Sequence, residues 1–362
     1  MRKYKEAKQM KKFDKASTAS KKAFLNYGIV ILFFVIFQTL VSTGNISSAL
    51  KGQLIPIACY MMMAVSLNLV VGISGELSLG HAGFMSVGAF TAVIVSSAMA
   101  DSSDISSLII SIIVAACVAA IAGFLIGIPV LRLNGDYLAI VTLAFGEIIK
   151  NILNCLYVGI DEKGVHFAFN NPASLAMSAT GKVIINGPMG AVGIRKISTF
   201  IAATVLLLII LIVIQNLVNS RTGRAIMAIR DNRIAAESMG LSPMKYKMLA
   251  FTVSAAMAGA AGAVYALNYS TLVPKKFDFN TSILVLVFVV LGGIGNMTGS
   301  LIAAGVLVVL PELLRKFSDY RMLVYAIVLI IVMLASNNEK LKGKLDTFFK
   351  KLRMKLSKGG RK

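Results

Sequence analysis

Long apolar runs separated by short polar segments dominate the sequence. About 20 apolar residues in a helix cross the ~30 Å hydrocarbon core of a bilayer, and the runs at 105–131 and 197–218 reach that length without a charged residue. The runs lie near 23–43, 53–71, 79–99, 105–131, 137–158, 197–218, 247–269, 281–294, 299–314 and 321–336. The pattern predicts an all-α, polytopic membrane helix bundle of about ten spans, with residues 23–336 forming the membrane domain.

The least regular part of this pattern is residues 281–314, where glycines interrupt two short apolar pieces. We expect two spans that meet at a tight turn containing Gly292, Gly293, Gly295 and Gly299. A re-entrant or broken helix is the alternative, because irregular backbone is tolerated inside a membrane where protein or water covers it.

The composition agrees with a membrane protein and removes one competing class. The 362 residues are 57% hydrophobic and 15% charged, yet 37 basic against 16 acidic residues give a formal net charge of +21. Such a charge is typical of nucleic-acid-binding proteins, but these place Lys and Arg over a soluble surface, and ordinary globular chains are only about 45–50% apolar. We therefore expect contact with a lipid bilayer and none with nucleic acid.

The distribution of Lys and Arg predicts the orientation, because cytoplasmic segments are enriched in these residues. Residues 1–22, 219–247 and 337–362 hold nine, six and ten of them. With ten spans and a cytoplasmic N-terminus, all three segments lie on the cytoplasmic side, as a basic arm, an internal loop and a basic tail. The opposite side receives the acidic loop at 101–104 and residues 159–196. Four bases on that side count against the assignment: Lys275, Lys276, Arg315 and Lys316.

The three cysteines give no sign of a disulfide framework or a zinc site. Cys59, Cys117 and Cys155 all lie inside apolar runs and lack paired spacing. We expect them to be small buried hydrophobic residues.

The cytoplasmic segment after the sixth span carries the start and stop signals of a short helix. Asp231 or Asn232 can cap its N-terminus, Gly240 suits the position just after its end, and Pro243 prevents its continuation. A helix this short is marginal in water, so we expect it to pack into a groove on a partner. A solvated basic loop that only fixes orientation is the alternative.

This segment resembles the coupling loop of ABC-importer permeases, whose pattern is Glu-Ala-Ala, three residues and Gly. Ala235, Ala236 and Gly240 match, whereas Ile234 stands where the pattern has Glu. The resemblance assigns contact with an ATPase subunit to the loop as a whole. Its other candidate residues are Arg224, Arg230, Asp231 and Asn232.

Further blocks make the resemblance more specific, and the chain is similar to the branched-chain amino-acid permeases of the Liv type. The stretch 223–265 resembles these proteins, and so do residues 72–83 (GISGELSLGHAG), 133–148 (LNGDYLAIVTLAFGEI) and 186–190 (NGPMG). Together with the glycine turn at 292–300, the resemblance covers roughly residues 55–335 in consistent order.

The resemblance implies the remaining components of the transporter. It implies a bacterial cytoplasmic-membrane importer of leucine, isoleucine and valine, with a second homologous permease subunit, two ATPase subunits and an extracytoplasmic substrate-binding protein. The sequence has no Gly-x-x-x-x-Gly-Lys-Ser/Thr run, so we expect ATP to bind the partner subunits rather than this chain. It also lacks a His-Glu-x-x-His motif and a Gly-x-Ser-x-Gly elbow, which disfavours an enzyme or a metal site.

Three ionisable residues are candidates for a translocation path. Glu147 and Lys150 lie within the fifth span at i,i+3 spacing, which places them on one helix face where they can pair. Intramembrane charges usually face a bundle interior or a water-filled path, so a pathway role and a structural ion pair both remain open. His81 can contact a substrate or act as a satisfied structural donor, and Glu76 is expected to be solvated.

Small residues predict close helix packing at two places. Gly72, Gly75, Gly80 and Gly83 precede or begin the third span, and small residues let backbones approach closely. In the seventh span the small residues recur at four-residue spacing, at Ala255, Gly259 and Ala263 and at Ala258 and Gly262.

Two other functions remain open on the sequence alone. A permease for urea or another small polar solute is the near alternative. An ion-coupled secondary transporter is the alternative from another class, because it would need no ATPase and could use Glu147 and Lys150 for coupling.

Overall fold

A computed structural model describes most of the predicted membrane domain. It covers residues 25–43, 48–99, 102–133, 135–161, 164–169, 181–314, and the single positions 171, 175, 323, 326, 327 and 330. The predicted arm at 1–22 and the predicted tail at 337–362 lie outside these residues. The chain divides into two compact units, Met1–Gly305 and Val306–Lys362, and the account below concerns the first.

Seven helices of the described residues are long and apolar enough to cross a membrane, which confirms seven of the predicted spans. Their ends lie within a few residues of the predicted limits, except that the second begins earlier. They are Leu25–Ser42, α2 (Ser48–Asn68) continued by the π-helical η1 (Leu69–Ser74), α3 (His81–Ala98), α4 (Asp104–Val130), α5 (Asp136–Cys155), α6 (Phe200–Asn219) and α9 (Pro243–Ala266).

The predicted turn between two short apolar helices at 281–314 is confirmed. α10 (Phe279–Gly292) and α11 (Met297–Leu313) are joined at Gly293 and Gly295, both with φ near +90°. A helix of 14 residues is only about 21 Å long, which is shorter than the ~30 Å hydrocarbon core of a bilayer. The predicted tenth span at 321–336 lies almost wholly outside the described residues.

Close packing of α9 against α3 and α4 forms the centre of this unit, as the four-residue spacing predicts. A Cβ at Gly88 of α3 would overlap the backbone of Gly259, and a Cβ at Gly259 would overlap Ala119 of α4. A Cβ at Gly262 would overlap the carbonyl oxygen of Met85. Backbones that approach this closely gain van der Waals contact without a side chain between them.

The glycines before α3 also act through close approach, as predicted. A Cβ at Gly80 would overlap the carbonyl oxygen of Thr142 in α5, and Gly83 lies against Gly146. The Oγ1 of Thr142 accepts a 3.0 Å hydrogen bond from the N–H of Leu79. The two sequence blocks that contain these residues therefore meet in space.

The described residues also form an antiparallel sheet, so the prediction of an all-α chain is wrong in this part. The strands are β1 (Leu156–Asp161), β2 (Gly164–Phe169), β3 (Lys182–Asn186), β4 (Ala191–Val192) and β5 (Thr271–Leu272). They pair in the order β2-β1-β3-β4-β5. Two 3₁₀ turns adjoin the sheet, η3 (Gly187–Met189) and η4 (Pro274–Lys276). Hydropathy missed the strands because they are short, and because the first residues of β1 continue the apolar run at 137–158.

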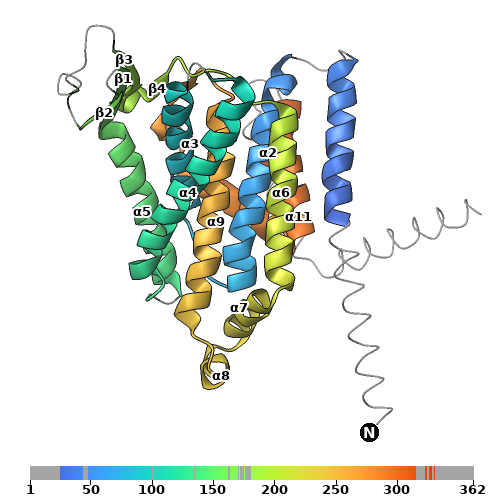
Figure 1. The fold of residues 1–362 in the computed structure, drawn as a ribbon. Helices are drawn as coiled ribbons and strands as arrows, with labels where there is room; N and C mark the ends of the chain where they lie inside the picture. Colours follow the sequence, from blue (N-terminus) through green and yellow to red (C-terminus); the bar gives the residue numbers. More distant parts are fainter. Residues whose placement is uncertain are drawn as a thin grey trace, which may run out of the picture. The chain divides into compact units, whose positions relative to one another are not determined.

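The sheet lies at one end of the helices, and α7 (Arg221–Asp231) and α8 (Arg233–Ser238) lie at the other (Figure 1). The Nη2 of Arg195, in the segment leading to α6, lies 2.6 Å from Oδ1 of Asp104 at the start of α4. This contact confirms that the acidic loop and residues 159–196 share an end. We refer below to the sheet end and the α7 end.

The prediction of three buried cysteines is wrong for two of them. Cys59 is buried, but Cys117 of α4 and Cys155 of α5 are exposed. Only about a fifth of the apolar window of each of these helices is buried inside the chain. The remaining apolar surface of α4 and α5 is therefore left for lipid or for another subunit.

Candidate functional site

The short helix predicted at the α7 end is present as α8, and its cap is now resolved. Asn232, rather than Asp231, is the N-cap, because its Oδ1 accepts a 3.0 Å hydrogen bond from the N–H of Ala235. Gly240 has φ +80° and follows the helix, where glycine adopts the left-handed region without strain. Pro243 is the first residue of α9. The sequence signals thus marked both ends of this element.

The apolar side chains of α8 face outward. Ile234 is 78% exposed and Met239, which follows the helix, is 83% exposed, while Ala236 is buried against the rest of the chain. Arg233 and Glu237 form an ion pair on the same short helix, with Nε 3.0 Å from Oε1. An exposed apolar tip surrounded by charge is the kind of surface that another protein covers.

The segment before α8 forms a helix of its own, α7, which the sequence did not predict as a separate element. Ser220 caps it through a 3.1 Å hydrogen bond accepted from Gly223, and Arg224 donates from Nη1 to the Asn219 carbonyl at 3.0 Å. Arg230, Asp231 and Asn232 end the helix. These contacts fix the angle at which the segment leaves α6.

Arg230 connects α7 to the π-helical end of the second span. Its Nη1 donates a 2.8 Å hydrogen bond to the carbonyl oxygen of Gly72, while its Nε and Nη2 donate to Oδ1 of Asp231. The aliphatic part of Arg230 packs on Gly75, which has φ +77° and no room for a Cβ. The absence of a side chain at Gly75 therefore admits the arginine side chain.

Asn68 carries this connection onward to the α10–α11 turn. It is fully buried; its Oδ1 accepts a 2.9 Å hydrogen bond from the N–H of Gly295, and its Nδ2 donates to Oγ of Ser300 at 3.0 Å. Gly72 packs directly against Gly295, because a Cβ there would overlap its backbone nitrogen. We call the series Arg230, Gly72, Asn68, Gly295 and Ser300 the α7–η1–turn contacts.

Sequence reasoning missed Asn68 and Ser300 entirely. The available signal was the amide of Asn68 within an apolar run, because a polar side chain inside a membrane protein usually requires a hydrogen-bond partner. The partner could not be identified, because Gly295 lies 227 positions away.

The expectation of a solvated Glu76 is also wrong. Its side chain is largely buried and forms an ion pair with Lys247 in the first two turns of α9. The pair joins the end of η1 to α9, at the same end of the helices as α7. A carboxylate in this position is retained without solvation because the ammonium compensates its charge.

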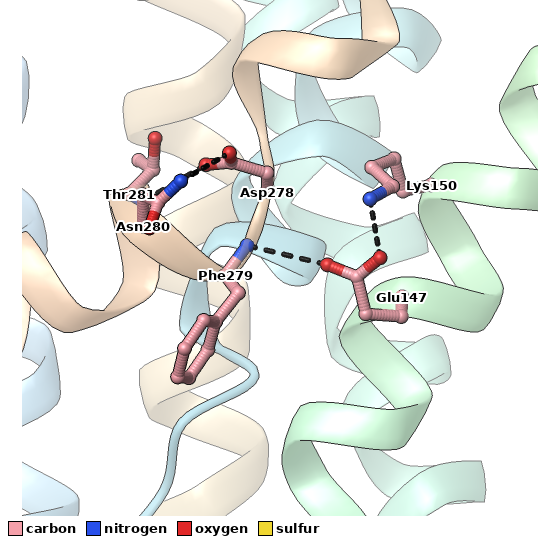
Figure 2. Close-up of polar contacts among 6 residues, drawn as sticks. All are labelled: Glu147, Lys150, Asp278, Phe279, Asn280 and Thr281. Atoms are coloured by element: carbon pink, nitrogen blue, oxygen red, sulfur yellow. Dashed lines mark hydrogen bonds and ion pairs between the residues drawn. The ribbon is translucent and has the colours of Figure 1, made fainter.

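Glu147 and Lys150 form the predicted i,i+3 ion pair, and Glu147 makes a second contact that the sequence did not reveal (Figure 2). Its Oε1 accepts a 3.2 Å hydrogen bond from the N–H of Phe279, in the first turn of α10. Asp278 caps the same helix by accepting from Thr281 at 3.0 Å. The carboxylate therefore ties the middle of α5 to the N-terminus of α10, where negative charge is favourable.

Substitutions of Glu147 distinguish its ion pair with Lys150 from its hydrogen bond with the Phe279 N–H. Glu147→Leu is expected to lower the free energy of unfolding by about 1–3 kcal/mol, because the Phe279 N–H and Lys150 both lose their partner. Glu147→Gln retains an acceptor for Phe279 and is expected to cost less. Thermal unfolding of the detergent-purified variants measures the difference. Equal destabilisation by Leu and Gln would contradict the role of the Phe279 contact, whereas a stable Gln variant without uptake would indicate a pathway role.

His81 does not meet these two residues in the described structure. It is 1% exposed, and its Nε2 lies 2.8 Å from Oγ of Ser66 in α2. The carbonyl of Ser66 in turn accepts a 2.6 Å hydrogen bond from Oγ of Ser254 in α9. This geometry matches a satisfied interhelical group. Contact between His81 and a substrate stays a prediction.

The described residues contain no group of three or more His, Cys, Asp or Glu side chains that could hold a metal ion. The polar groups at the α7 end are instead arranged as hydrogen bonds between helices and as an exposed helix tip. Such contacts can transmit a movement of α7 and α8 to the second span and to the α10–α11 turn.

Comparison with known proteins gives a consistent result. A family model described as "Branched-chain amino acid transport system / permease component" matches residues 50–333. The high-affinity branched-chain amino acid transport system permease protein LivM of Salmonella typhimurium is 36% identical over 327 residues, which cover 88% of this chain and 74% of that protein; LivM of Escherichia coli K12 gives the same values. The probable branched-chain amino acid transport permease protein LivM of Methanocaldococcus jannaschii is 28% identical over 204 residues, or 56% of this chain and 54% of that protein. No solved structure matches.

Proposed function

The chain belongs to the family of branched-chain amino acid transport permease components, and from this premise we propose that it is the membrane-spanning permease subunit of an ABC importer for leucine, isoleucine and valine. The family match makes it a multi-pass membrane protein of a transport system. The observation that carries the importer mechanism is the exposed tip of α8, with Ile234 and Met239 facing outward beyond the helices.

The proposed topology has about ten crossings, with both termini on the cytoplasmic side of the inner membrane. The basic segment 219–247 contains α7 and α8, and the sheet lies at the opposite end (Figure 1). Leu25, the first residue of the first helix, lines the same cavity as Asn219, so this helix begins at the α7 end. The shared end supports a cytoplasmic basic arm. The helices α10 and α11 and residues 321–336 complete the count.

The proposed coupling step starts at α8. An ATPase subunit holds ATP and covers the α8 tip, and its closure displaces α7 and α8 together. Arg230 then moves the Gly72 carbonyl, and Asn68 moves the α10–α11 turn, which shifts the bundle between outward and inward access. This chain contributes no cofactor to the step; it transmits the displacement through hydrogen bonds between helices.

The remaining partners are assigned to other surfaces. The poorly buried sides of α4 and α5 are available to a homologous permease subunit. The substrate-binding protein is proposed to dock at the sheet end, where Phe167 and Phe169 of β2 are exposed. The polar face that carries Glu147 and Lys150 is the proposed translocation path.

A substitution at Gly240 tests the coupling function. Gly240→Arg strains the left-handed turn after α8 and places a charged side chain beside the docking tip, so leucine uptake is expected to fall about tenfold or more. Radiolabelled uptake and affinity purification of the tagged chain measure transport and ATPase association. Gly52→Arg is the matched control, because Gly52 lies at the start of α2 with open space around it.

Three outcomes would overturn the proposal in whole or in part. Purification without any ATPase subunit, together with unchanged uptake by Gly240→Arg, would contradict the ABC-importer function. Uptake that survives ATP depletion but stops with an ionophore would identify an ion-coupled transporter. Competition by urea rather than by leucine, isoleucine and valine would assign a different substrate.

A further inference from the structure

A cavity of about 510 Å³ opens at the α7 end, beside the α7–η1–turn contacts, with which it shares Gly295. Four elements surround it: the start of the first helix, the end of η1, the end of α6, and the α10–α11 turn with the first residues of α11. The lining residues are Leu25, Asn26, Ile73, Gln215, Val218, Asn219, Gly295, Asn296, Met297 and Thr298. The volume lies within the range of small-molecule sites, roughly 300–1,000 Å³.

Gln215 is the unusual residue of this cavity. It is only 6% exposed, and neither Nε2 nor Oε1 has a hydrogen-bond partner among the described residues. A buried amide without partners costs roughly 1–3 kcal/mol for each unsatisfied group. Its position in the cavity wall therefore indicates a ligand that supplies both an acceptor for Nε2 and a donor for Oε1.

The N-terminus of α11 lies in the same wall. Asn296 precedes this 17-residue helix, and Met297 and Thr298 form its first turn. The first N–H groups of a helix have no carbonyl partner within it, and together they favour a negatively charged group. None of the described residues that line the cavity is acidic, so none of them opposes an anion. The Gln215 amide and the helix N-terminus thus provide donors suited to a carboxylate.

The rest of the wall is apolar or neutral. Leu25, Ile73, Val218 and Met297 provide aliphatic surface, whereas Asn219 provides an additional amide near Gln215 in the sequence. A ligand with a carboxylate and an aliphatic side chain would match these polar and aliphatic parts of the wall. A group with N–H donors on the same molecule would satisfy the Gln215 Oε1.

We propose that this cavity binds an aliphatic α-amino acid, with its carboxylate at the N-terminus of α11 and at Nε2 of Gln215. The ammonium donates to Oε1 of Gln215, and the side chain lies against the aliphatic wall. The choice of amino acid and its approach from the cytoplasm rest on the proposed function. The site is separate from Glu147 and Lys150, which do not line the cavity.

Direct binding tests the site without transport. The full-length chain, co-purified with its partner subunits into nanodiscs, is incubated with labelled L-leucine in the absence of the substrate-binding protein. Saturable binding is expected, and Gln215→Leu should weaken it about tenfold or more, because two hydrogen bonds to the ligand are lost. Asn216→Leu is the matched control, since Asn216 is the exposed next residue of α6 and does not line the cavity.

Competing ligands identify the group that is recognised. Leucinamide lacks the carboxylate and is expected to displace labelled leucine poorly, whereas 4-methylpentanoate retains the carboxylate and should compete. Gln215→Glu, which keeps the size of the side chain but faces the carboxylate with a negative charge, should also weaken binding. Equal competition by leucinamide, or unchanged binding by a correctly folded Gln215→Leu or Gln215→Glu variant, would overturn the site.

Uptake by the complete importer separates this proposal from the proposed function. Leucine uptake without any leucine binding to the wild-type chain would leave the importer function standing and remove the cavity site. Absence of leucine uptake would remove the importer function, while binding and competition of 4-methylpentanoate would still decide the carboxylate site.

Discussion

Arg230→Ala is expected to reduce leucine uptake about 10- to 100-fold while ATP hydrolysis by the assembled transporter continues. A hydrogen bond to a charged donor contributes about 1.5–3 kcal/mol, which corresponds to that range of rate. The guanidinium of Arg230 donates the hydrogen bond that connects α7 to the Gly72 carbonyl. Without it, displacement of α7 and α8 no longer moves η1, so hydrolysis is uncoupled from transport.

Parallel measurement of uptake and of phosphate release in proteoliposomes checks this expectation. Arg221→Ala is the matched control, because it removes the same charge from the exposed first residue of α7. Arg230→Lys keeps the charge but lacks the several donors of the guanidinium that contact Gly72 and Asp231 together, so an intermediate loss is expected. Unchanged uptake by Arg230→Ala, or a parallel loss of uptake and hydrolysis, would contradict a coupling role.

Gly259→Val is expected to prevent accumulation of the folded protein. A Cβ at this position already overlaps Ala119 of α4, and Gly259 also lies against Gly88 of α3. Accommodating a branched side chain requires both helices to move away from α9, and overpacking of this kind costs about 1–3 kcal/mol or more at one site. Because Gly259 contacts α3 and α4 at once, we expect a destabilisation at the upper end of this range.

Fluorescence-detected size-exclusion chromatography and thermal unfolding measure this loss. Gly28→Val introduces the same side chain into the exposed face of the first helix, where no atom lies within 4 Å of the added Cβ. That variant is expected to accumulate normally. A Gly259→Val protein that elutes and unfolds like the wild type would show that the α3, α4 and α9 contact tolerates separation.

Local patterns in the sequence were sufficient to locate the long helices and the short helix α8. The apolar runs located seven spans, since a helix of about 20 apolar residues is the usual way to satisfy backbone groups in a membrane. The capping signals at Asn232 and Gly240 located α8, and the four-residue spacing around Gly259 located the close contact of α9 with α3 and α4. Each of these signals depends on residues near one another in the chain.

The sheet shows where such patterns fail. β1 follows directly on α5, and β5 joins β4 from a segment about 80 positions further along the chain. Strands of two to six residues carry too little hydrophobic alternation to be identified singly. Their backbone groups are satisfied only when distant strands pair, which a local reading cannot detect.

The candidate sites divide in the same way. The sequence by itself determined that Glu147 and Lys150 share a helix face on which they can pair, and where the short helix α8 begins and ends. Only the tertiary structure decided that Arg230 bonds to Gly72, that Asn68 bonds to Gly295, that Glu76 is paired with Lys247 and that Gln215 faces a cavity. The reason is physical: helix periodicity and capping are set within a few residues, whereas a buried polar group is satisfied by whichever segment the fold brings within about 3 Å.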